Sequence, residues 1–418
     1  MKIENIKLSH ATKKIKGTVQ LTGSKSESNR ALILQALSHG IVNIQNLSDA
    51  ADTEIMTASL QLIQGNSIDT VKTIDIGPAG TAMRFLTSFL TLADGEFILT
   101  GTERMQERPI GILVDALATL GAKITYQNKE GYPPIKIEGG FQQLKSEILV
   151  QGDISSQYIS SLLLIAASLK KGLKINIQGE LTSRPYVTMT LDMLKEAGIT
   201  HKWSDNAIQI DAQNFKEKTI FVEPDWSAAS YWYSMVALSD NGEILLPGLK
   251  EKSLQGDSAI IEIMSHFGVN SHFTTEGLHI KKTGILSDKT LFNFKECPDL
   301  AQTIVALAAA LKRDISITGV ETLKIKETDR LNALKIEIRK FGANLVTEGD
   351  IYHVKTNNVY QPDTLTFDTY EDHRMAMAFA PLALIFNEVT INEPEVVHKS
   401  YPAFWDHLQQ HGFQIEKL

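Results

Sequence analysis

A Gly/Ser-rich segment with two basic residues, 22–30, directly precedes an apolar, helix-like stretch at 31–37. The basic residues are Lys25 and Arg30. Backbone N–H groups and the positive end of a helix dipole favour anion binding at such a position. The spacing is not that of a nucleotide P-loop, because a single residue separates the glycine from Lys25. We therefore predict an anion site here. The alternative is that the serines of the segment only cap the helix.

Five further polar segments also precede helix-like stretches. They are residues 77–84, 101–110, 153–158, 324–330 and 371–374. Several contain arginine, which binds phosphate and carboxylate groups bidentately. The structural alternatives are a tight turn, a charged surface loop, an N-cap or a solvated run of charges. If the helices are arranged alike, their N-termini converge. The segments then form an anion-binding cleft with several basic residues and a few carboxylates.

The motifs of several common enzyme sites are missing from this sequence. It has neither the His-Glu-x-x-His nor the paired-cysteine spacing of metal sites. It also has no Gly-x-Ser-x-Gly nucleophile elbow and no Gly-x-Gly-x-x-Gly dinucleotide fingerprint. We therefore expect chemistry that needs neither a metal ion nor an organic cofactor.

The elements that must position these segments follow a repeated plan. Residues 157–210, 227–280 and 301–354 each begin with an Ala/Leu-rich helix, followed by a strand, a polar loop, an amphipathic helix and a hairpin. Weaker copies occupy 30–76, 81–137 and 375–415. Each second helix is expected to stop at a glycine. These glycines are Gly65, Gly121, Gly198, Gly268, Gly342 and Gly412. The alternative is the general self-similarity of long α/β proteins, which six copies in phase argue against.

Length and composition indicate a soluble globular protein. The 418 residues suggest two or three domains, and 43% of them are hydrophobic. The net charge of −8 makes a nucleic-acid partner a poor expectation. The longest apolar run, 375–386, is too short for a membrane span, and Pro381 interrupts it. No signal peptide is recognisable at the N-terminus, and Cys297 is the single cysteine. We expect a cytoplasmic protein without a membrane partner.

Six motifs together resemble one enzyme family. They are GSKSESNRAL at 23–32, AGTAMR at 79–84, RMQERPIG at 104–111, DISSQY at 153–158, KETDRL at 326–331 and DHRMAM at 372–377. In this order and spacing they are similar to the 5-enolpyruvylshikimate 3-phosphate synthases, which belong to the enolpyruvyl transferases. The similarity extends over nearly the whole chain.

The resemblance implies an α/β protein with the inside-out enolpyruvyl transferase fold, in which each of two lobes has three βαβαββ units. Lobe 1 is expected at 1–20 plus 224–418, and lobe 2 at 21–223. The active site is expected in the cleft between them, with closure on the substrate. The implied reaction transfers the enolpyruvyl group of phosphoenolpyruvate to the 5-hydroxyl of shikimate 3-phosphate. It releases phosphate and serves aromatic amino-acid biosynthesis through chorismate. We expect a monomer whose partners are these two small molecules.

The resemblance also assigns residues. Asp299 is expected to accept the hydroxyl proton, Glu327 to donate a proton to the methylene carbon, and Lys25 to contact both substrates. The groups for shikimate 3-phosphate are Lys25, Ser26, Arg30, Ser155, Ser156, Gln157, Ser183, Tyr186, Asp299, Thr322 and Lys326. Those for phosphoenolpyruvate are Lys25, Gly80, Arg108, Gln157, Arg330, Arg374 and Lys399. Such cations would position two mutually repelling anions and stabilise a crowded intermediate.

Departures from the family pattern occur at three positions and in one segment. Pro78 stands where the family usually has Asn, and Phe85 where it usually has Pro, which leaves the response to the inhibitor glyphosate open. Thr322 stands where an Asn is usual in the phosphate site. The segment before Gly77 is short, so we expect a trimmed surface hairpin there.

Two alternatives are weighed against this interpretation. The related UDP-N-acetylglucosamine enolpyruvyl transferases share the fold and the donor, but they typically carry a cysteine in the loop that corresponds to 101–108, which has none here. They also have Lys-Asn where this chain has Lys25-Ser26. The other alternative is a non-catalytic, anion-binding repeat protein, in which Asp299 and Glu327 would be dispensable.

Overall fold

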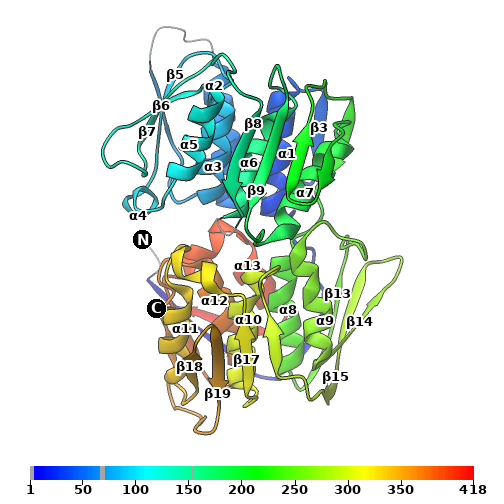
Figure 1. Cartoon of the computed structure of the whole chain (residues 1–418). Helices are drawn as coiled ribbons and strands as arrows, with labels where there is room; N and C mark the ends of the chain where they lie inside the picture. The colour runs from blue at the N-terminus through cyan, green and yellow to red at the C-terminus, as the bar shows by residue number, and fades with distance from the viewer. Residues whose placement is uncertain (1–3, 66–70, 153–154) are drawn as a thin grey trace. The chain divides into compact units, whose positions relative to one another are not determined.

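The chain forms two compact units. The computed structural model describes residues 4–65, 71–152 and 155–418. Unit 1 comprises Met1–Thr22 and Glu223–Leu418, and unit 2 comprises Gly23–Val222 (Figure 1). The chain therefore passes between the units twice. Asp153 and Ile154 of the fourth polar segment lie outside the described residues.

Unit 1 contains three four-stranded sheets, ordered β20-β21-β1-β22, β14-β15-β13-β2 and β16-β17-β19-β18. Their strands are β1 (Asn5–His10), β2 (Lys14–Thr18), β13 (Asn241–Leu246), β14 (Phe267–Phe273), β15 (Leu278–Leu286), β16 (Leu291–Asn293), β17 (Ile315–Thr318), β18 (Asn344–Glu348), β19 (Ile351–Lys355), β20 (Thr366–Phe367), β21 (Val389–Asn392) and β22 (Phe413–Lys417). Figure 1 shows β13, β14 and β15 as one sheet beside helices α8 and α9.

Unit 2 contains two four-stranded sheets, β10-β11-β9-β8 and β4-β5-β7-β6, and a two-stranded sheet, β12-β3. Their strands are β3 (Val42–Gln45), β4 (Lys72–Asp75), β5 (Glu96–Thr100), β6 (Lys123–Tyr126), β7 (Ile135–Glu138), β8 (Glu147–Gln151), β9 (Leu173–Gln178), β10 (Lys202–Ser204), β11 (Ala207–Ile210) and β12 (Lys218–Phe221). In the described part of the first repeat no further strand joins β3 and β12.

Every four-stranded sheet combines one parallel pair with two antiparallel pairs. In one of them β16 is parallel to β17, while β17 and β18 are both antiparallel to β19. A parallel pair needs a crossover, which here is a helix, whereas the hairpin closes directly. This is the βαβαββ pattern. The sheets therefore confirm the α/β fold class that the sequence repeats predict.

Where the chain passes between the units, strands pair with partners that are distant in sequence. Strand β2 precedes the first helix of unit 2 but lies parallel to β13 of unit 1. Strand β12 precedes the first long helix of the second half but lies parallel to β3 of unit 2. The N-terminal strand β1 completes the sheet of the C-terminal repeat. Each unit is thus completed by a strand that is distant in sequence.

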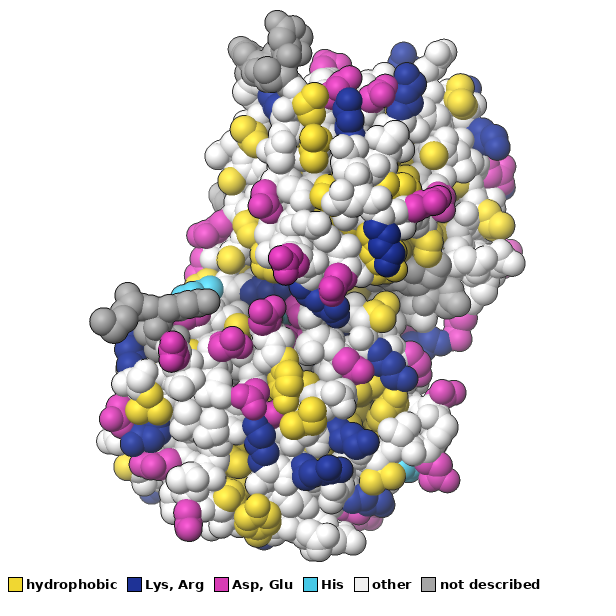
Figure 2. All heavy atoms as spheres, turned by 90° about the vertical axis from the view of Figure 1, so that its left-hand side faces the viewer, with side chains coloured by type: hydrophobic (Ala, Val, Ile, Leu, Met, Phe, Trp, Pro, Cys, Tyr) yellow, Lys and Arg dark blue, Asp and Glu magenta, His cyan; other side chains and the backbone are white. Residues whose placement is uncertain are grey.

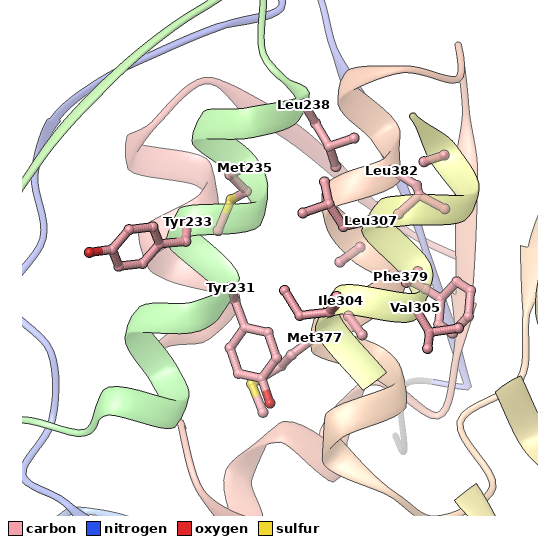
Figure 3. Close-up of a cluster of buried hydrophobic side chains, with 14 of the residues drawn as sticks. Tyr231, Tyr233, Met235, Leu238, Ile304, Val305, Leu307, Met377, Phe379 and Leu382 are labelled. Atoms are coloured by element: carbon pink, nitrogen blue, oxygen red, sulfur yellow. The ribbon is translucent and has the colours of Figure 1, made fainter. Parts of the chain in front are cut away.

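Helices form the interior of each unit. In unit 1 they are α8 (Trp226–Leu238), η1 (Gly256–Ala259), α9 (Ile260–Ser265), η2 (Pro298–Leu300), α10 (Ala301–Ala310), η3 (Glu321–Ile325), α11 (Arg330–Arg339), α12 (His373–Phe379), η4 (Ala380–Leu384), η5 (Pro394–Lys399) and α13 (Phe404–Gln410). Side chains of α8, α10 and α12 pack together, including Tyr231, Ile304 and Met377 (Figure 3). The strands alternate buried and partly exposed residues, so one face of each sheet is less buried than the other.

Unit 2 repeats this arrangement. Its helices are α1 (Lys25–Leu37), α2 (Ala51–Gln64), α3 (Gly80–Leu90), α4 (Glu103–Gln106), α5 (Gly111–Leu120), α6 (Ser156–Ala166) and α7 (Arg184–Glu196). Helices α1, α3 and α6 pack on one another in its interior. Among the described residues no helix is both long and apolar enough to cross a membrane.

The structure corrects several expectations about element boundaries. Helix α1 begins at Lys25, so Lys25 and Arg30 lie inside it rather than in a preceding loop. The apolar run 375–386 divides into α12 and η4, because Pro381 cannot continue the helical hydrogen bonding. The segment 101–110 is itself partly helical, because it contains the short helix α4 before α5 begins at Gly111.

Not every predicted terminal glycine ends a helix in the left-handed conformation. Gly121, Gly198, Gly342 and Gly412 have positive φ just after a helix, as a C-terminal glycine often does. Gly65 follows α2 with a φ of −66°, in extended backbone. Gly268 lies inside β14, at an irregular register with β15, so α9 ends before it.

Candidate active site

Arg330 is the centre of a buried charge cluster in unit 1. It is the first residue of α11, and its side chain is 2% exposed. Its Nε donates to Asp372 Oδ2 at 2.7 Å, its Nη1 to Asp299 Oδ1 at 2.9 Å and its Nη2 to Glu327 Oε2 at 3.0 Å. Three carboxylates therefore share one guanidinium, which compensates much of the cost of burying their charges.

Arg374 and Lys399 bring two more cations to this cluster. Arg374 Nη2 donates to Asp299 Oδ2 at 2.9 Å, so the two oxygens of Asp299 accept from two different arginines. Lys399 Nζ lies 2.9 Å from Glu327 Oε1. The side chain of Asp372 accepts from the backbone N–H of Arg374 at 2.9 Å and so caps α12. The structure thus brings together Asp299, Glu327, Arg330, Arg374 and Lys399, as the resemblance implies.

The surrounding cations set the charge state of Asp299. Burial alone would favour the neutral acid. The charges of Arg374, Lys326 and Arg330 outweigh that effect and hold the pKa of Asp299 well below its usual range. The charges of Asp372, Glu327 and Asp299 raise the pKa of Arg330, although burial alone would lower it. Asp299 is therefore ionised at neutral pH.

A fourth carboxyl group, Asp257, is connected to this cluster through Ser227 and was not predicted from the sequence. Its Oδ2 accepts a short hydrogen bond from Ser227 Oγ, and its side chain is buried. Arg374 Nη2 also donates to Ser227 Oγ at 3.4 Å. The sequence pattern could have indicated Asp257. This residue lies in a polar segment directly before the apolar start of α9, just as the six predicted anion-binding segments lie before their helices.

In unit 2, Lys25 and Arg30 lie on α1 with different surroundings. Lys25 Nζ is 3.2 Å from Asp52 Oδ2 of α2. Ser24 caps the helix by accepting from the backbone N–H of Glu27 at 3.4 Å, so this serine fits the structural alternative. Ser26 lies inside the helix and does not cap it.

The Arg30 guanidinium is almost fully enclosed by unit 2. Nε donates to Thr190 Oγ1 at 2.7 Å, and Nη1 to the carbonyl oxygen of Ser26 at 2.8 Å. Nη2 donates to the carbonyl oxygen of Tyr186 at 3.2 Å, and the ring centroid of Phe85 lies 5.2 Å from Cζ. Burial lowers the pKa of Arg30 to about 10, so it remains a cation at neutral pH. Tyr186 is therefore close to Arg30, as expected.

Gly80 and Arg108 are in close contact. A Cβ atom at Gly80 would lie 2.7 Å from Arg108 Nη1, so this first residue of α3 must lack a side chain for the arginine to keep its place. Arg84, one turn further on, donates to the carbonyl oxygen of Pro109 at 3.0 Å. That interaction connects α3 to the segment between α4 and α5.

The remaining predicted residues lie mostly at or near the ends of helices. Gln157 Nε2 donates to Thr81 Oγ1 at 3.3 Å, which connects α6 to α3. Ser155 caps α6 by accepting from the N–H of Gln157, and Ser156 begins that helix. Ser183 precedes α7 with a left-handed φ of 52°. The structure places Thr322 in η3 and Lys326 directly after it.

In the part of the chain that the structure describes, neither the surface charge nor the arrangement of possible metal ligands indicates a further site. Figure 2 shows acidic and basic side chains interspersed over the visible face. Within the described ranges no group of three or more His, Cys, Asp or Glu side chains is arranged to hold a metal ion. The arrangement described above is suited to binding anions and to proton transfer by two carboxylates.

Comparisons with known proteins agree with one another. The family model described as EPSP synthase (3-phosphoshikimate 1-carboxyvinyltransferase) matches residues 9–408. A 3-phosphoshikimate 1-carboxyvinyltransferase of Bacteroides fragilis is 48% identical over 408 residues, covering 97% of this chain and 98% of its own. One from a Sulfurovum species is 38% identical, covering 94% and 96%.

Solved structures show the same fold at low sequence identity. EPSP synthase from Acinetobacter baumannii superposes with a TM-score of 0.78 at 19% identity, covering 99% of this chain and 100% of its own. The enolpyruvyl transferase NikO from Streptomyces tendae gives a TM-score of 0.74 at 15% identity, covering 99% and 98%. These likenesses establish the architecture, with its repeated βαβαββ units.

Proposed function

The chain belongs to the EPSP synthase family. We propose that the charge cluster around Arg330 in unit 1 and the basic residues of unit 2 have different roles in the reaction of that family. The reaction itself transfers the enolpyruvyl group of phosphoenolpyruvate to shikimate 3-phosphate and releases phosphate. It is a transferase step of the shikimate pathway, which supplies aromatic biosynthesis. The assignment of individual residues and their roles is the proposal.

Two carboxylates carry the protons. Asp299 takes the proton of the 5-hydroxyl as the hydroxyl oxygen bonds to C2 of phosphoenolpyruvate, and Glu327, in its protonated form, gives a proton to the methylene carbon. A tetrahedral intermediate results, with a methyl group and a phosphate on the same carbon. In the elimination Glu327 takes back a methyl proton, Asp299 returns its proton to the departing phosphate, and the enol double bond is restored. The ionised state of Asp299 supports its role as the acceptor.

The cations bind the phosphoenolpyruvate anion. We assign Arg330, Arg374 and Lys399 of unit 1 to its carboxylate and phosphate, because guanidinium and ammonium groups stabilise such charges as they develop. The observation that supports this assignment is the shared position of Arg330 and Arg374 on the two oxygens of Asp299. From unit 2 the resemblance adds Lys25, Gly80, Arg108 and Gln157.

Shikimate 3-phosphate is assigned mainly to helix starts of unit 2, where backbone N–H groups favour a phosphate. The enclosed position of Arg30 beside Ser26 and Tyr186 supports a role in fixing the acceptor's orientation. The complete proposed set is Lys25, Ser26, Arg30, Ser155, Ser156, Gln157, Ser183, Tyr186, Asp299, Thr322 and Lys326.

The protein is further proposed to work as a monomer in the cytoplasm. A single cysteine, Cys297, supports a reducing compartment, and it is buried in unit 1. Light scattering on the purified chain tests the monomer, since a mass near twice 46.3 kDa would contradict it.

The position of Asp299 between two arginines is the observation on which the proposed chemistry rests. The experiment measures phosphate release from phosphoenolpyruvate with either shikimate 3-phosphate or UDP-N-acetylglucosamine as acceptor, without added metal. Release with shikimate 3-phosphate alone is the expected result. Release with the nucleotide sugar alone would replace the acceptor but keep the fold and the donor.

A further inference from the structure

The buried carboxyl group of Asp257 is connected to the proposed active site by a single hydroxyl group. Asp257 lies in η1 and is 3% exposed. Its Oδ2 accepts from Ser227 Oγ in the first turn of α8. Its Oδ1 is buried and has no hydrogen-bond partner among the described residues. A buried carboxylate oxygen without a donor favours the neutral form of the acid.

The direction of the hydrogen bonds through Ser227 is fixed by the donors. Arg374 Nη2 carries only protons to donate, so Ser227 Oγ accepts from it at 3.4 Å. The hydroxyl proton of Ser227 is then given to Asp257 Oδ2. The same Nη2 donates to Asp299 Oδ2 at 2.9 Å. Arg374 is thus held between Asp299 on one side and the Ser227–Asp257 pair on the other.

We propose that Asp257 is a positioning residue, which holds the guanidinium of Arg374 in place through Ser227 and weakens phosphoenolpyruvate binding when it becomes ionised. The inference rests on the proposed function, in which Arg374 binds that substrate. Ionised Asp257 competes with the substrate anion for Arg374, whereas neutral Asp257 leaves the charge of Arg374 available. Asp257 itself is not assigned any contact with a substrate.

The surroundings of Asp257 place its titration near neutrality. Burial and then the charge of Asp299 raise the pKa of Asp257 to about 7, against the opposing charge of Arg374 and the hydrogen bond from Ser227. Asp225, the N-cap of α8, adds a further negative charge. The thiol of Cys297 also faces this carboxyl group, and burial keeps that thiol neutral by raising its pKa.

The KM for phosphoenolpyruvate is expected to rise with pH. Below pH 7 Asp257 is protonated and adds no negative charge beside Arg374. As the pH rises through 7, Asp257 gains a negative charge, so the KM for phosphoenolpyruvate rises. If only the neutral form permits tight binding, the rise between pH 6 and pH 8 is up to about tenfold for a single group with this pKa.

The experiment compares the wild-type enzyme with Asp257→Asn, which keeps the shape and removes the charge change. The KM for phosphoenolpyruvate is measured at pH 6, 7 and 8 with saturating shikimate 3-phosphate. We expect the KM of the wild type to rise more steeply with pH than that of Asp257→Asn. The phosphate ionisations of the substrates are common to both enzymes and cancel in the comparison. The same pH dependence in both enzymes would overturn the proposal.

Two further variants separate this role from a merely structural one. Ser227→Ala keeps both carboxyl groups and removes the connection. It should raise the KM for phosphoenolpyruvate at pH 6 and leave that for shikimate 3-phosphate unchanged. An unaltered KM would contradict the role, even if Asp257→Asn fails to fold. Glu243→Gln, which changes a half-buried carboxylate on β13 that pairs with Lys281, serves as the matched control. A wild-type enzyme that transfers no enolpyruvyl group would instead contradict the proposed function.

Discussion

Arg330 and Asp372 form an ion pair inside unit 1, with 2.7 Å between Nε and Oδ2 and side-chain exposures of 2% and 0%. Neither charge is stable at such a depth without a partner. Asp372 also caps α12 through the N–H of Arg374, so one carboxylate fixes both arginines of the cluster. The stability of unit 1 and the geometry of the proposed site are therefore connected.

The first prediction concerns this pair. Asp372→Ala should lower the free energy of unfolding by about 3–5 kcal/mol, because it leaves Arg330 with less compensation and removes the cap. Urea denaturation followed by circular dichroism measures the change. Asp363→Ala, at an exposed position, should stay within about 0.5 kcal/mol. Equal losses in the two variants would show that the buried pair has no special role.

The second prediction concerns Asp299. Asp299→Asn should lower kcat by about 10²–10⁴-fold, since the amide cannot accept the hydroxyl proton. The KM for shikimate 3-phosphate should change much less. Because nearby cations hold the pKa of Asp299 well below its usual range, protonation of this group should not reduce wild-type kcat between pH 5 and 8. Steady-state kinetics measures both quantities. A variant that loses affinity in proportion to turnover would contradict a role in proton transfer.

Local patterns in the sequence indicate part of the buried charge cluster. The polar segments 324–330 and 371–374 lead directly into helices α11 and α12, so Arg330 and Arg374 lie at the starts of these helices. Such boundaries are visible because helices need caps and have an apolar face. The repeats likewise predict the recurring sheets, since each copy contains the same order of helix and strand signals.

Contacts between distant elements are outside the reach of local patterns. The pairing of β2 with β13 and of β12 with β3 joins segments about 200 residues apart, and nothing in either strand specifies its partner. The same applies to Asp257, which meets Ser227 only through tertiary packing. Phe85 was noted as a departure from the family, but its position over Arg30 follows from how α1 and α3 pack.

The third prediction concerns Glu327 as the proton donor. In deuterated water the addition step carries solvent deuterium into the methyl group of the intermediate, and its reversal leaves deuterium in phosphoenolpyruvate. Glu327→Gln should therefore slow this exchange at least as strongly as it slows turnover. Mass spectrometry of recovered phosphoenolpyruvate measures it. Exchange at the wild-type rate in a variant with impaired turnover would assign the methylene proton to another group. Glu321→Gln, at an exposed position in η3, is the control.

The fourth prediction concerns Phe85, where the family usually has Pro. Its ring lies over the Arg30 guanidinium, an interaction that contributes on the order of 0.5–2 kcal/mol. Phe85→Leu should therefore raise the KM for shikimate 3-phosphate by about twofold to about 30-fold, while that for phosphoenolpyruvate changes little. Phe89→Leu on the same helix is the matched control, because no cation–π contact of Phe89 is found in the described part of the chain. Equal effects of both variants would indicate a general packing defect in α3.

The fifth prediction concerns a buried amide near the start of α10. Gln302 is 0% exposed, and neither polar atom of its side chain has a hydrogen-bond partner within the described residues. Burying an amide without partners costs free energy, so Gln302→Met, of similar volume, should raise the free energy of unfolding by about 1 kcal/mol. Gln143 offers the opposite case, since its Nε2 donates to the carbonyl oxygen of Gly172 at 2.8 Å and its Oε1 accepts from the N–H of Lys171.

Gln143→Met should therefore lower the free energy of unfolding by about 1–3 kcal/mol, because it leaves buried backbone groups without partners. Thermal and urea unfolding of both variants gives the comparison. Local fluorescent labels follow each unit separately, because the two units need not unfold together. A loss of stability in both variants would mean that the Gln302 amide is satisfied in solution, for which an ordered water is the simplest partner. Opposite signs would show that these two buried glutamines differ in stability because one amide has hydrogen-bond partners and the other has none.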